Sequence, residues 1–439
     1  MAGRFPDAPD LPTWWRNLTA GRSAIREVPK ERWDVASVFA PQPAKEGKTY
    51  SRWAAMLTDV DRFDHRFFNL SPREAEEIDP QQRLFLREAW NALEHAGHAG
   101  RTVEGRRCGV FVGCAQGDYA RLLEEGGRGD TGQAFLGNAT SILAARIAYF
   151  LDLHGPTVAI DTACSSSLVA VHLACQSLRG GDVDLALAGG VALMVTPSLQ
   201  VRSSQVGMLS PTGTSAPFSA SADGIVLGEG VGVVVLRRLE DAERDGDRVY
   251  GVIVGSGING DGKTNGITAP SATAQAALLR RVYAEAGVSP RDLSYIETHG
   301  TGTSLGDPIE FKALREVYEE AATARGSVAL GSVKGNIGHT TMTAGIAGLL
   351  KVLLCLEHEQ LPPTAGFTTA NPKVDFATSP FSMTDRLRSW PSSGARLAAV
   401  SSFGFSGTNC HLVVKESPMP RARHTAGPEL IPISARSEA

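Results

Sequence analysis

A single cysteine lies where a short strand-like run gives way to a long apolar run, and this junction constrains the fold more than any other stretch. Residues Thr157 to Ile160 are mostly β-branched and favour a strand, whereas Leu168 to Leu178 is long enough for a helix. Ser165 to Ser167, between the two runs, are typical of a helix start. The helix would be apolar almost all round, with His172 and Gln176 among its few polar side chains. We therefore predict a strand, a tight turn and a helix buried inside a large protein.

Cys164 would lie at the N-terminus of this central helix. Backbone N–H groups and the helix dipole stabilise an anion there, so we expect the pKa of the thiol to fall from about 8.5 towards roughly 7. Enzymes of the α/β class hold nucleophiles at strand-to-helix corners of this kind. The alternative is a buried structural thiol, as expected for Cys175 or Cys355. The local sequence leaves both interpretations open.

At about 150 residues per domain, the length suggests two or three units, but the composition marks no boundary between them. The chain has 439 residues, and no change of composition before residue 415 marks a boundary between domains. We therefore expect two fused halves around one core. The net charge of −4 and the lack of a strong basic run give no electrostatic footprint for nucleic acid or an anionic membrane surface, so neither partner is predicted.

The expected compartment follows from the cysteines and the apolar runs. The six cysteines lie far apart and show neither CxxC pairs nor zinc-finger spacing, which favours reduced thiols in the cytoplasm. The N-terminus lacks a basic stretch followed by an apolar one, and no run approaches the roughly 18 apolar residues of a membrane span. We therefore expect a cytoplasmic protein without a membrane partner.

Short apolar runs alternate with helical patterns along the chain, which predicts α/β layers. Gly109 to Gly113 favours a buried strand, and Leu11 to Leu18 favours an amphipathic helix. Further helices are expected from Asp79 to Ala96, with Asp79 as N-cap, and from Asn138 to Leu151 beside the Cys164 turn. The same alternation continues through Val231 to Leu236, Val249 to Val254, Ala274 to Ala286, Leu293 to Glu297, Val328 to Val333 and Ala344 to Leu356. Residues 416–429 are rich in proline and charge, as in a linker.

One glycine motif suggests dinucleotide binding, but its context argues against it. Gly255 to Gly260 matches G-x-G-x-x-G and follows a strand-like run. Asp261 to Ile267 is turn-like where a helix should begin, and Arg280-Arg281 stands about where the ribose-binding acid is expected. We therefore predict no dinucleotide site here.

Two histidines follow strand-like runs in the second half. His299 lies in IETHGTGTSLGDP, where glycines let the backbone approach a ligand and the hydroxyls of Thr301 and Thr303 can bond amides. His339 lies in VKGNIGHTTMTAGIA, between a glycine turn and an apolar helix. Both histidines can share a site with Cys164 only if two halves face each other. No carboxylate or cysteine lies at metal-ligand spacing, which favours acid–base or hydrogen-bonding roles over a metal site.

The last motif is VSSFGFSGTNCHLVV, from Val400 to Val414, which predicts a strand, a glycine loop and a returning strand. A core aromatic is the alternative for Phe403 and Phe405. Glycines on both sides of Phe405 favour a mobile loop whose backbone N–H can serve an oxyanion.

DTACSSS with Cys164, HGTGTSLGDP with His299, KGNIGH with His339 and GFSGTN with Phe405 together resemble the β-ketoacyl synthase (ketosynthase) domain of modular type I polyketide synthases. The likeness runs from about Gly3 to Val414. It implies a thiolase-like α/β fold of two similar αβαβα halves with a five-layered core. The ketosynthase domain would span residues 1–415, with halves at about 1–250 and 251–415, and residues 416–439 would begin a linker.

The resemblance also implies an acyltransferase of secondary-metabolite biosynthesis that elongates a polyketide by decarboxylative Claisen condensation. Cys164 would carry the acyl chain, and His299 and His339 would promote decarboxylation of a malonyl-type extender. Backbone N–H groups of Cys164 and Phe405 would form the oxyanion hole. Lys334 would hold the surroundings of His339, and Thr301 and Thr303 would contact the substrate arm.

The implied partners are acyl carrier proteins, neighbouring modules and a second copy of the chain. No cofactor is expected to be bound, because substrates arrive on the phosphopantetheine of the carrier protein. Within catalysis, the alternative is a non-elongating ketosynthase that only transfers acyl chains; such domains typically lack a catalytic histidine. A scaffold without chemistry is disfavoured by Cys164, and a cysteine hydrolase leaves the two histidine motifs unexplained.

The chain departs from the family pattern in two places. It starts at Met1, directly before the GRFP motif, so an opening apolar strand is expected to be absent or to lie outside this sequence. Ser219 stands where an aspartate is common.

Overall fold

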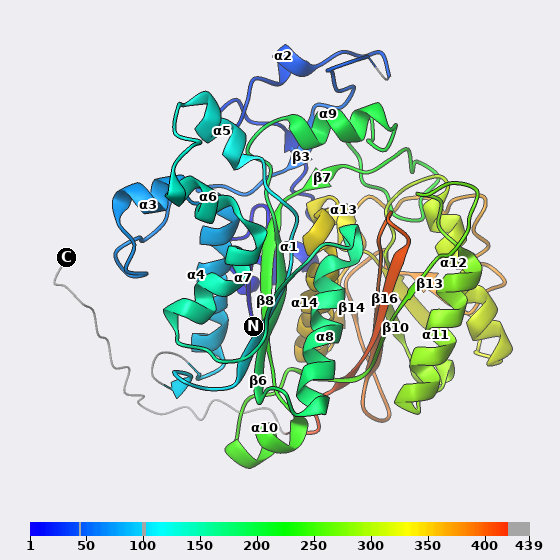
Figure 1. The fold of residues 1–439 in the computed structure, drawn as a ribbon. Coiled ribbons are helices and arrows are strands. Elements are labelled where there is room, and N and C mark those ends of the chain that lie inside the picture. The colour runs from blue at the N-terminus through cyan, green and yellow to red at the C-terminus, as the bar shows by residue number, and fades with distance from the viewer. Residues whose placement is uncertain (44, 99–101, 420–439) are drawn as a thin grey trace.

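The computed structural model describes residues 1–43, 45–98 and 102–419, and its core contains two β-sheets (Figure 1). The first sheet has the strand order β1-β8-β6-β4-β5, and the second has the order β13-β11-β10-β15-β16-β9. The first comprises β1 (Ala2–Arg4), β4 (Cys108–Gly113), β5 (Thr157–Ile160), β6 (Leu185–Ala192) and β8 (Gly230–Leu236). The second comprises β9 (Gly251–Gly260), β10 (Tyr295–Glu297), β11 (Val328–Gly331), β13 (Phe381–Met383), β15 (Leu397–Phe403) and β16 (Thr408–Glu416).

Helices separate and flank the two sheets (Figure 1). Helices α4 (Pro80–His95) and α7 (Thr140–Phe150) cover the outer face of the first sheet, and α11 (Ala272–Ala286) and α12 (Gly306–Glu320) cover that of the second. Helices α8 (Ser166–Gly180) and α14 (Ala344–His358) lie between the sheets. The order helix, sheet, helix, sheet, helix confirms the predicted five-layered α/β core.

The remaining elements surround these layers. Two small sheets pair β2 (Arg26–Glu27) and β7 (Leu227–Gly228) with β3 (Trp53–Ala55), and β12 (Gln360–Leu361) with β14 (Arg388–Ser389). The other helices are α1 (Leu11–Thr19), α2 (Val35–Val38), α3 (Pro72–Glu77), α5 (Tyr119–Glu125), α6 (Gly132–Asn138), α9 (Ser198–Gln205), α10 (Leu239–Asp245) and α13 (Lys334–Ile337). The predicted amphipathic helix at Leu11 and the N-cap at Asp79, whose carboxylate accepts from Gln81 N–H at 2.8 Å, are confirmed.

The central helices are buried because apolar side chains surround their axes. Every residue of α14 from Ala344 to Leu356 is buried. Contrary to the expectation from sequence, the stretch Thr341–His358 is long and apolar enough to cross a membrane by length and composition. It is, however, 78% buried inside the protein, as a core helix between two sheets is expected to be.

The structure clarifies both departures from the family pattern. Ala2–Arg4 form β1, which pairs antiparallel with β8 at Gly3 and Gly232, so these first residues occupy the edge of the first sheet. Ser219 is buried, and its hydroxyl donates to the carbonyl oxygen of Thr369 at 3.1 Å. A serine at this position is therefore fully accommodated.

The glycine motif Gly255 to Gly260 lies within β9 along its whole length. It therefore has a strand conformation rather than the strand–turn–helix that a dinucleotide fingerprint requires. This agrees with the prediction made from its sequence context.

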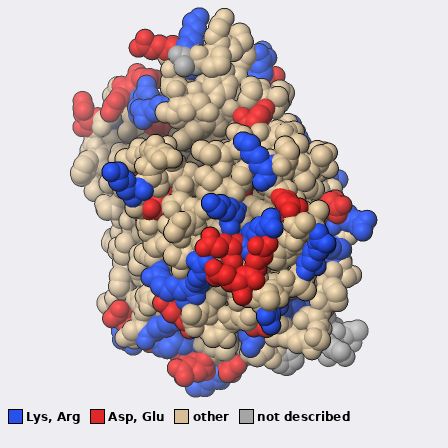
Figure 2. Space-filling view, turned by 90° about the vertical axis from the view of Figure 1, so that its right-hand side faces the viewer, with Lys and Arg blue, Asp and Glu red and all other residues tan. Residues whose placement is uncertain are grey.

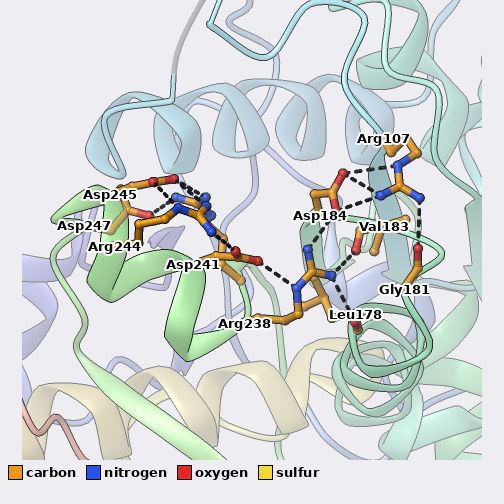
Figure 3. Close-up of polar contacts among 11 residues, drawn as sticks. Arg107, Leu178, Gly181, Val183, Asp184, Arg238, Asp241, Arg244, Asp245 and Asp247 are labelled. Carbon is orange, nitrogen blue, oxygen red and sulfur yellow. Dashed lines mark hydrogen bonds and ion pairs between the residues drawn. The ribbon is translucent and has the colours of Figure 1, made fainter.

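A network of ion pairs and hydrogen bonds surrounds the C-terminal end of α8 (Figure 3). Arg238 donates to Asp184 and Asp241 at 2.7 Å each, and to the carbonyl oxygens of Leu178 and Val183 at 3.1 and 2.9 Å. These bonds join α10 to the end of α8 and to the loop before β6. A cavity of about 600 Å³ lies beside this network, lined in part by Leu178 and Arg238. It therefore lies at the opposite end of α8 from Cys164.

The face presented by the right-hand side of Figure 1 carries a central group of acidic side chains bordered by basic ones (Figure 2). On α11, Arg280 lies 2.6 Å from both Glu316 and Glu320 of α12. Charge on this face is therefore locally compensated between the two helices.

Candidate active site

The turn that carries Cys164 has the geometry predicted from its sequence. Strand β5 ends at Ile160, a 3₁₀ turn spans Ala163–Ser165, and α8 begins at Ser166. Ala163 has a φ of 57°, a left-handed conformation that is strained for a residue with a side chain. Asp161 supports this conformation by accepting a 3.0 Å hydrogen bond from Ala163 N–H. The backbone thus turns sharply at the residue before the cysteine.

The second half of the chain completes this turn. Ser402, in β15, donates a 2.7 Å hydrogen bond to the carbonyl oxygen of Cys164. Gly404 packs so tightly that a Cβ there would collide with the carbonyl oxygen of Thr162. The next residue, Phe405, has a half-exposed ring, and its backbone N–H bonds the Cys164 thiol and lowers the pKa of that thiol. The loop between β15 and β16 therefore reaches the Cys164 thiol through its backbone.

The structure brings both sequence-predicted histidines together. His299 follows β10 and His339 follows α13, and their ring centroids lie 5.5 Å apart with the planes at 81°. The ring of Phe403 lies 5.6 Å from that of His299. Phe403, in β15, is therefore an apolar wall of the site, whereas the Phe405 ring is the exposed one.

Both imidazoles are uncharged at neutral pH. Burial holds the pKa of each ring well below its ordinary value, and the charge of Lys334 lowers both further. His339 Nδ1 accepts a 3.2 Å hydrogen bond from Thr341 N–H, so Nε2 carries the proton of the neutral ring and is free to donate. His299 Nδ1 is buried without a hydrogen-bond partner in the described part of the chain. His339 therefore retains Nε2 as a donor for a ligand, whereas Nδ1 of His299 is closed off from solvent.

Lys334 is the cation shared by the candidate site. It is buried, it donates a hydrogen bond to the carbonyl oxygen of His299, and its charge lowers the pKa of Cys164 and of both imidazoles. Burial lowers the pKa of Lys334 itself, while the carboxylates of Glu297 and Glu310 raise it. The direct contact of Lys334 is thus with the His299 loop rather than with His339.

The hydroxyls of Thr301 and Thr303 are engaged within their own loop. They lie 3.0 Å apart, Thr301 also bonds Asp307 at 3.3 Å, and Thr303 accepts from Gly306 N–H at 3.0 Å. Both residues are only partly buried, so each can still meet a ligand from the open side.

Two carboxylates that the sequence reasoning did not single out hold this loop. Glu310 accepts from the N–H groups of His299 and Gly300 at 2.7 and 2.8 Å, and Asp307 accepts from Gly302 N–H at 3.1 Å. Burial raises the pKa of Glu310 to about 7 and that of Asp307 to about 6. The sequence offered one signal for them: both are acidic residues near the start of the helix that follows the His299 motif.

The expectation of a lowered thiol pKa at Cys164 was wrong. Burial between the two halves raises its pKa above the ordinary value, and this outweighs the lowering by Lys334 and by the N–H groups of Phe405 and Cys164. The helix-dipole argument considered only the local sequence and therefore omitted the cost of burying a thiolate.

Comparisons with known proteins agree with this arrangement. Residues 1–242 match the family described as "Beta-ketoacyl synthase, N-terminal domain", residues 250–368 match "Beta-ketoacyl synthase, C-terminal domain", and residues 370–439 match "Ketoacyl-synthetase C-terminal extension". The chain belongs to the β-ketoacyl synthase family, and it is an acyl-transferring enzyme domain of the polyketide synthase type.

Similar proteins are found among large synthases. The chain is 49% identical over 418 residues to polyketide synthase PksL of Bacillus subtilis (strain 168), covering 95% of this chain and 9% of that protein. It is 46% identical over 453 residues to polyketide synthase ThaG of Burkholderia thailandensis, covering 100% of this chain and 8% of the relative. The chain therefore spans a small part of either relative.

Solved structures confirm the predicted thiolase-like fold. The ketosynthase from module 6 of the bacillaene synthase of Bacillus subtilis 168 has a TM-score of 0.89 and 47% identity, covering 95% of this chain and 71% of that one. The oxazolomycin ketosynthase domain OzmH KS7 of Streptomyces albus JA3453 has a TM-score of 0.91 and 42% identity, covering 95% and 74% of the two chains.

Proposed function

We propose that this domain elongates a polyketide chain by decarboxylative Claisen condensation. The observation that carries the proposal is the pair of neutral imidazoles, 5.5 Å apart, that shares the cation Lys334 with the Cys164 thiol. A domain that only transferred acyl groups would need the thiol and an oxyanion hole, but not two neutral imidazoles. The paired rings therefore favour elongation.

In the first half-reaction, the sulfur of Cys164 attacks the thioester carbon of an acyl carrier protein. The phosphopantetheine thiol leaves and takes up the proton released from Cys164. The tetrahedral oxyanion is stabilised by backbone N–H groups of Cys164 and Phe405. In the free protein the thiol contacts these same two N–H groups. They therefore lie where the carbonyl oxygen of an attacked thioester can reach them.

In the second half-reaction, the carbon–carbon bond to the carboxylate of a malonyl-type extender breaks and carbon dioxide leaves. The electron pair passes into the thioester as an enolate, whose oxygen is stabilised by the imidazoles of His299 and His339. The enolate carbon attacks the acyl carbonyl on Cys164, and the carbon–sulfur bond breaks. Cys164 is regenerated as a thiolate, and the β-ketoacyl product stays on the carrier.

The partners proposed for this reaction are acyl carrier proteins and the neighbouring modules of a cytoplasmic synthase. Thr301 and Thr303, on the open side of the His299 loop, are suited to the phosphopantetheine arm. The ketosynthase domain would span residues 1–415 as two halves, about 1–250 and 251–415, and residues 416–439 would begin a linker. Its described portion ends at residue 419, so residues 420–439 lie outside the described structure.

A second copy of the chain is proposed to pair at β5. This strand lies at the edge of the first sheet, and no further described strand pairs with its outer side. Tyr149, on α7 beside β5, is 90% exposed, and Phe135, on α6 which packs against α7, is 73% exposed. An open edge beside exposed aromatic side chains is typical of a surface that is covered in an assembly.

The test is to supply the domain with an acyl thioester and a malonyl carrier protein. Peptide mapping should place the acyl group on Cys164, and carbon dioxide and a β-ketoacyl product should follow. Cys164→Gln should decarboxylate the extender without condensing, because the amide occupies the oxyanion site but offers no acyl acceptor. If the wild-type domain transfers its cognate acyl group without releasing carbon dioxide above background, the transacylase alternative replaces elongation.

A further inference from the structure

A buried ion pair lies behind the two histidines, and the mechanism above does not use it. The carboxylate of Glu297, at the end of β10, lies 2.8 Å from the ammonium of Lys351 in α14, with both side chains almost fully inaccessible to solvent. The ammonium has no aligned hydrogen-bond acceptor among the described residues, so this ion pair compensates its charge. The buried charge of Lys351 is thus compensated by that of Glu297.

The remaining contacts of Glu297 join the strands that lead to the two histidines. Glu297 Oε1 accepts a 2.6 Å hydrogen bond from Val333 N–H, directly before Lys334. Glu297 Oε2 accepts a 2.6 Å hydrogen bond from the hydroxyl of buried Tyr295, which orients the carboxylate. One carboxylate therefore connects β10, which ends just before His299, with the turn that leads to His339.

The ion pair extends this connection to α14, the helix that follows His339. Helix α14 approaches β10 closely at Gly348, where an added Cβ would lie 3.1 Å from Glu297 Cγ. Lys351, on the same helix, lies against Oε2 of Glu297, whereas Val333 N–H bonds Oε1. The three segments that determine where the imidazoles lie therefore meet at a single side chain.

We propose that Glu297, paired with Lys351, is a positioning residue that sets the relative placement of the His299 and His339 imidazoles for decarboxylation. The inference rests on the proposed elongation function. A buried ion pair contributes little net stability compared with a well-packed apolar pair, so replacing both partners should leave the fold intact. Its proposed effect on rate is through geometry, where a misplacement of about 1 Å can cost on the order of 100-fold. Glu297 also raises the pKa of Lys334, and Tyr295→Phe, which keeps both charges, separates positioning from that electrostatic contribution.

The test uses the double variant Glu297→Gln/Lys351→Met, because Glu297→Gln alone leaves a buried cation without a counter-charge. The matched control is Glu88→Gln, which removes another buried carboxylate that pairs with Arg87 at 3.2 Å on the distant helix α4. In the double variant we expect wild-type acylation of Cys164 and an unchanged KM for the malonyl carrier. The kcat for carbon dioxide release should fall about tenfold or more.

A merely structural role predicts a different pattern, because partial unfolding lowers acylation and carbon dioxide release in equal proportion. A folded double variant with wild-type carbon dioxide release overturns the proposal. If the double variant does not fold, Tyr295→Phe removes only the hydroxyl that orients Glu297. A severalfold loss of carbon dioxide release with intact acylation then supports positioning, and no loss contradicts it.

A second measurement separates this proposal from the proposed function. In protein labelled with ¹⁵N-histidine, the imidazole signals of His299 and His339 should both shift in the double variant and stay unchanged in Glu88→Gln. If the wild type releases no carbon dioxide, elongation fails, and the imidazole signals alone decide on positioning. If the imidazole signals do not shift in the double variant, the positioning proposal is overturned.

Discussion

The imidazole rings of His299 and His339 meet edge to face, with their centroids 5.5 Å apart, although each ring follows a different element. Two neutral rings so placed can donate to one oxygen from two directions without charge repulsion between them. Neutrality depends on burial, which lowers the pKa of both rings, and on Lys334, which lowers them further. Two neutral donors so placed suit the enolate of the proposed decarboxylation.

Replacing His339 should separate the two half-reactions. His339→Ala removes a donor directed at the extender, so acylation of Cys164 should stay within a few fold of wild type. Carbon dioxide release should slow by roughly 10²- to 10³-fold, as for the loss of one preorganised donor. The measurements are intact-protein mass spectrometry and carbon dioxide release, with exposed His154→Ala as the control. A variant that cannot be acylated at all would contradict this division of labour.

The pH dependence of Cys164 alkylation should report its raised pKa. Because burial raises the pKa of this thiol, the thiolate forms only as pH rises, and the rate with iodoacetamide should still be increasing above the ordinary value of about 8.5. Lys334→Met removes a cation that lowers this pKa, so the profile should move to higher pH. Exposed Lys263→Met is the control and should leave the profile unchanged. A wild-type midpoint below the ordinary value would refute the burial argument.

The close contact at Gly404 should make even a methyl group harmful. In Gly404→Ala the added Cβ collides with Thr162 O, which moves the loop and with it the Phe405 N–H away from the thiol. Loss of one oxyanion donor typically costs about 10²- to 10³-fold, so acylation should slow by up to this amount. Gly394→Ala, where a Cβ meets nothing within 4 Å, should react at the wild-type rate. Equal rates in the two variants would exclude the loop from the acylation step.

The domain should be a dimer that survives dilution, because β5 leaves a sheet edge open beside Tyr149 and Phe135. Light scattering at micromolar concentration should give twice the mass of one chain. Tyr149→Lys places a charge on the proposed interface and should shift the mass towards the monomer. A wild-type monomer would count against pairing at this edge.

The local parts of the structure were predictable from the sequence, because short-range pattern decides them. The strand, turn and helix around Cys164 follow from β-branched residues, serines and an apolar run. The meeting of His299 with His339 could not follow from spacing, because it depends on β10 pairing in parallel with β11. The thiol pKa was predicted with the wrong sign, because burial by the second half cannot be seen in the residues around Cys164.

The hydrogen bond from Ser402 to the Cys164 carbonyl has a consequence for synthesis of the protein on the ribosome. Cys164 leaves the ribosome before β15, which supplies this bond, and before the loop that supplies the Phe405 N–H. Because domains fold as units, the nascent first half carries its cysteine without the groups that complete its pocket. The Ser402 hydrogen bond and the Phe405 N–H therefore join Cys164 only after the last two strands have left the exit tunnel.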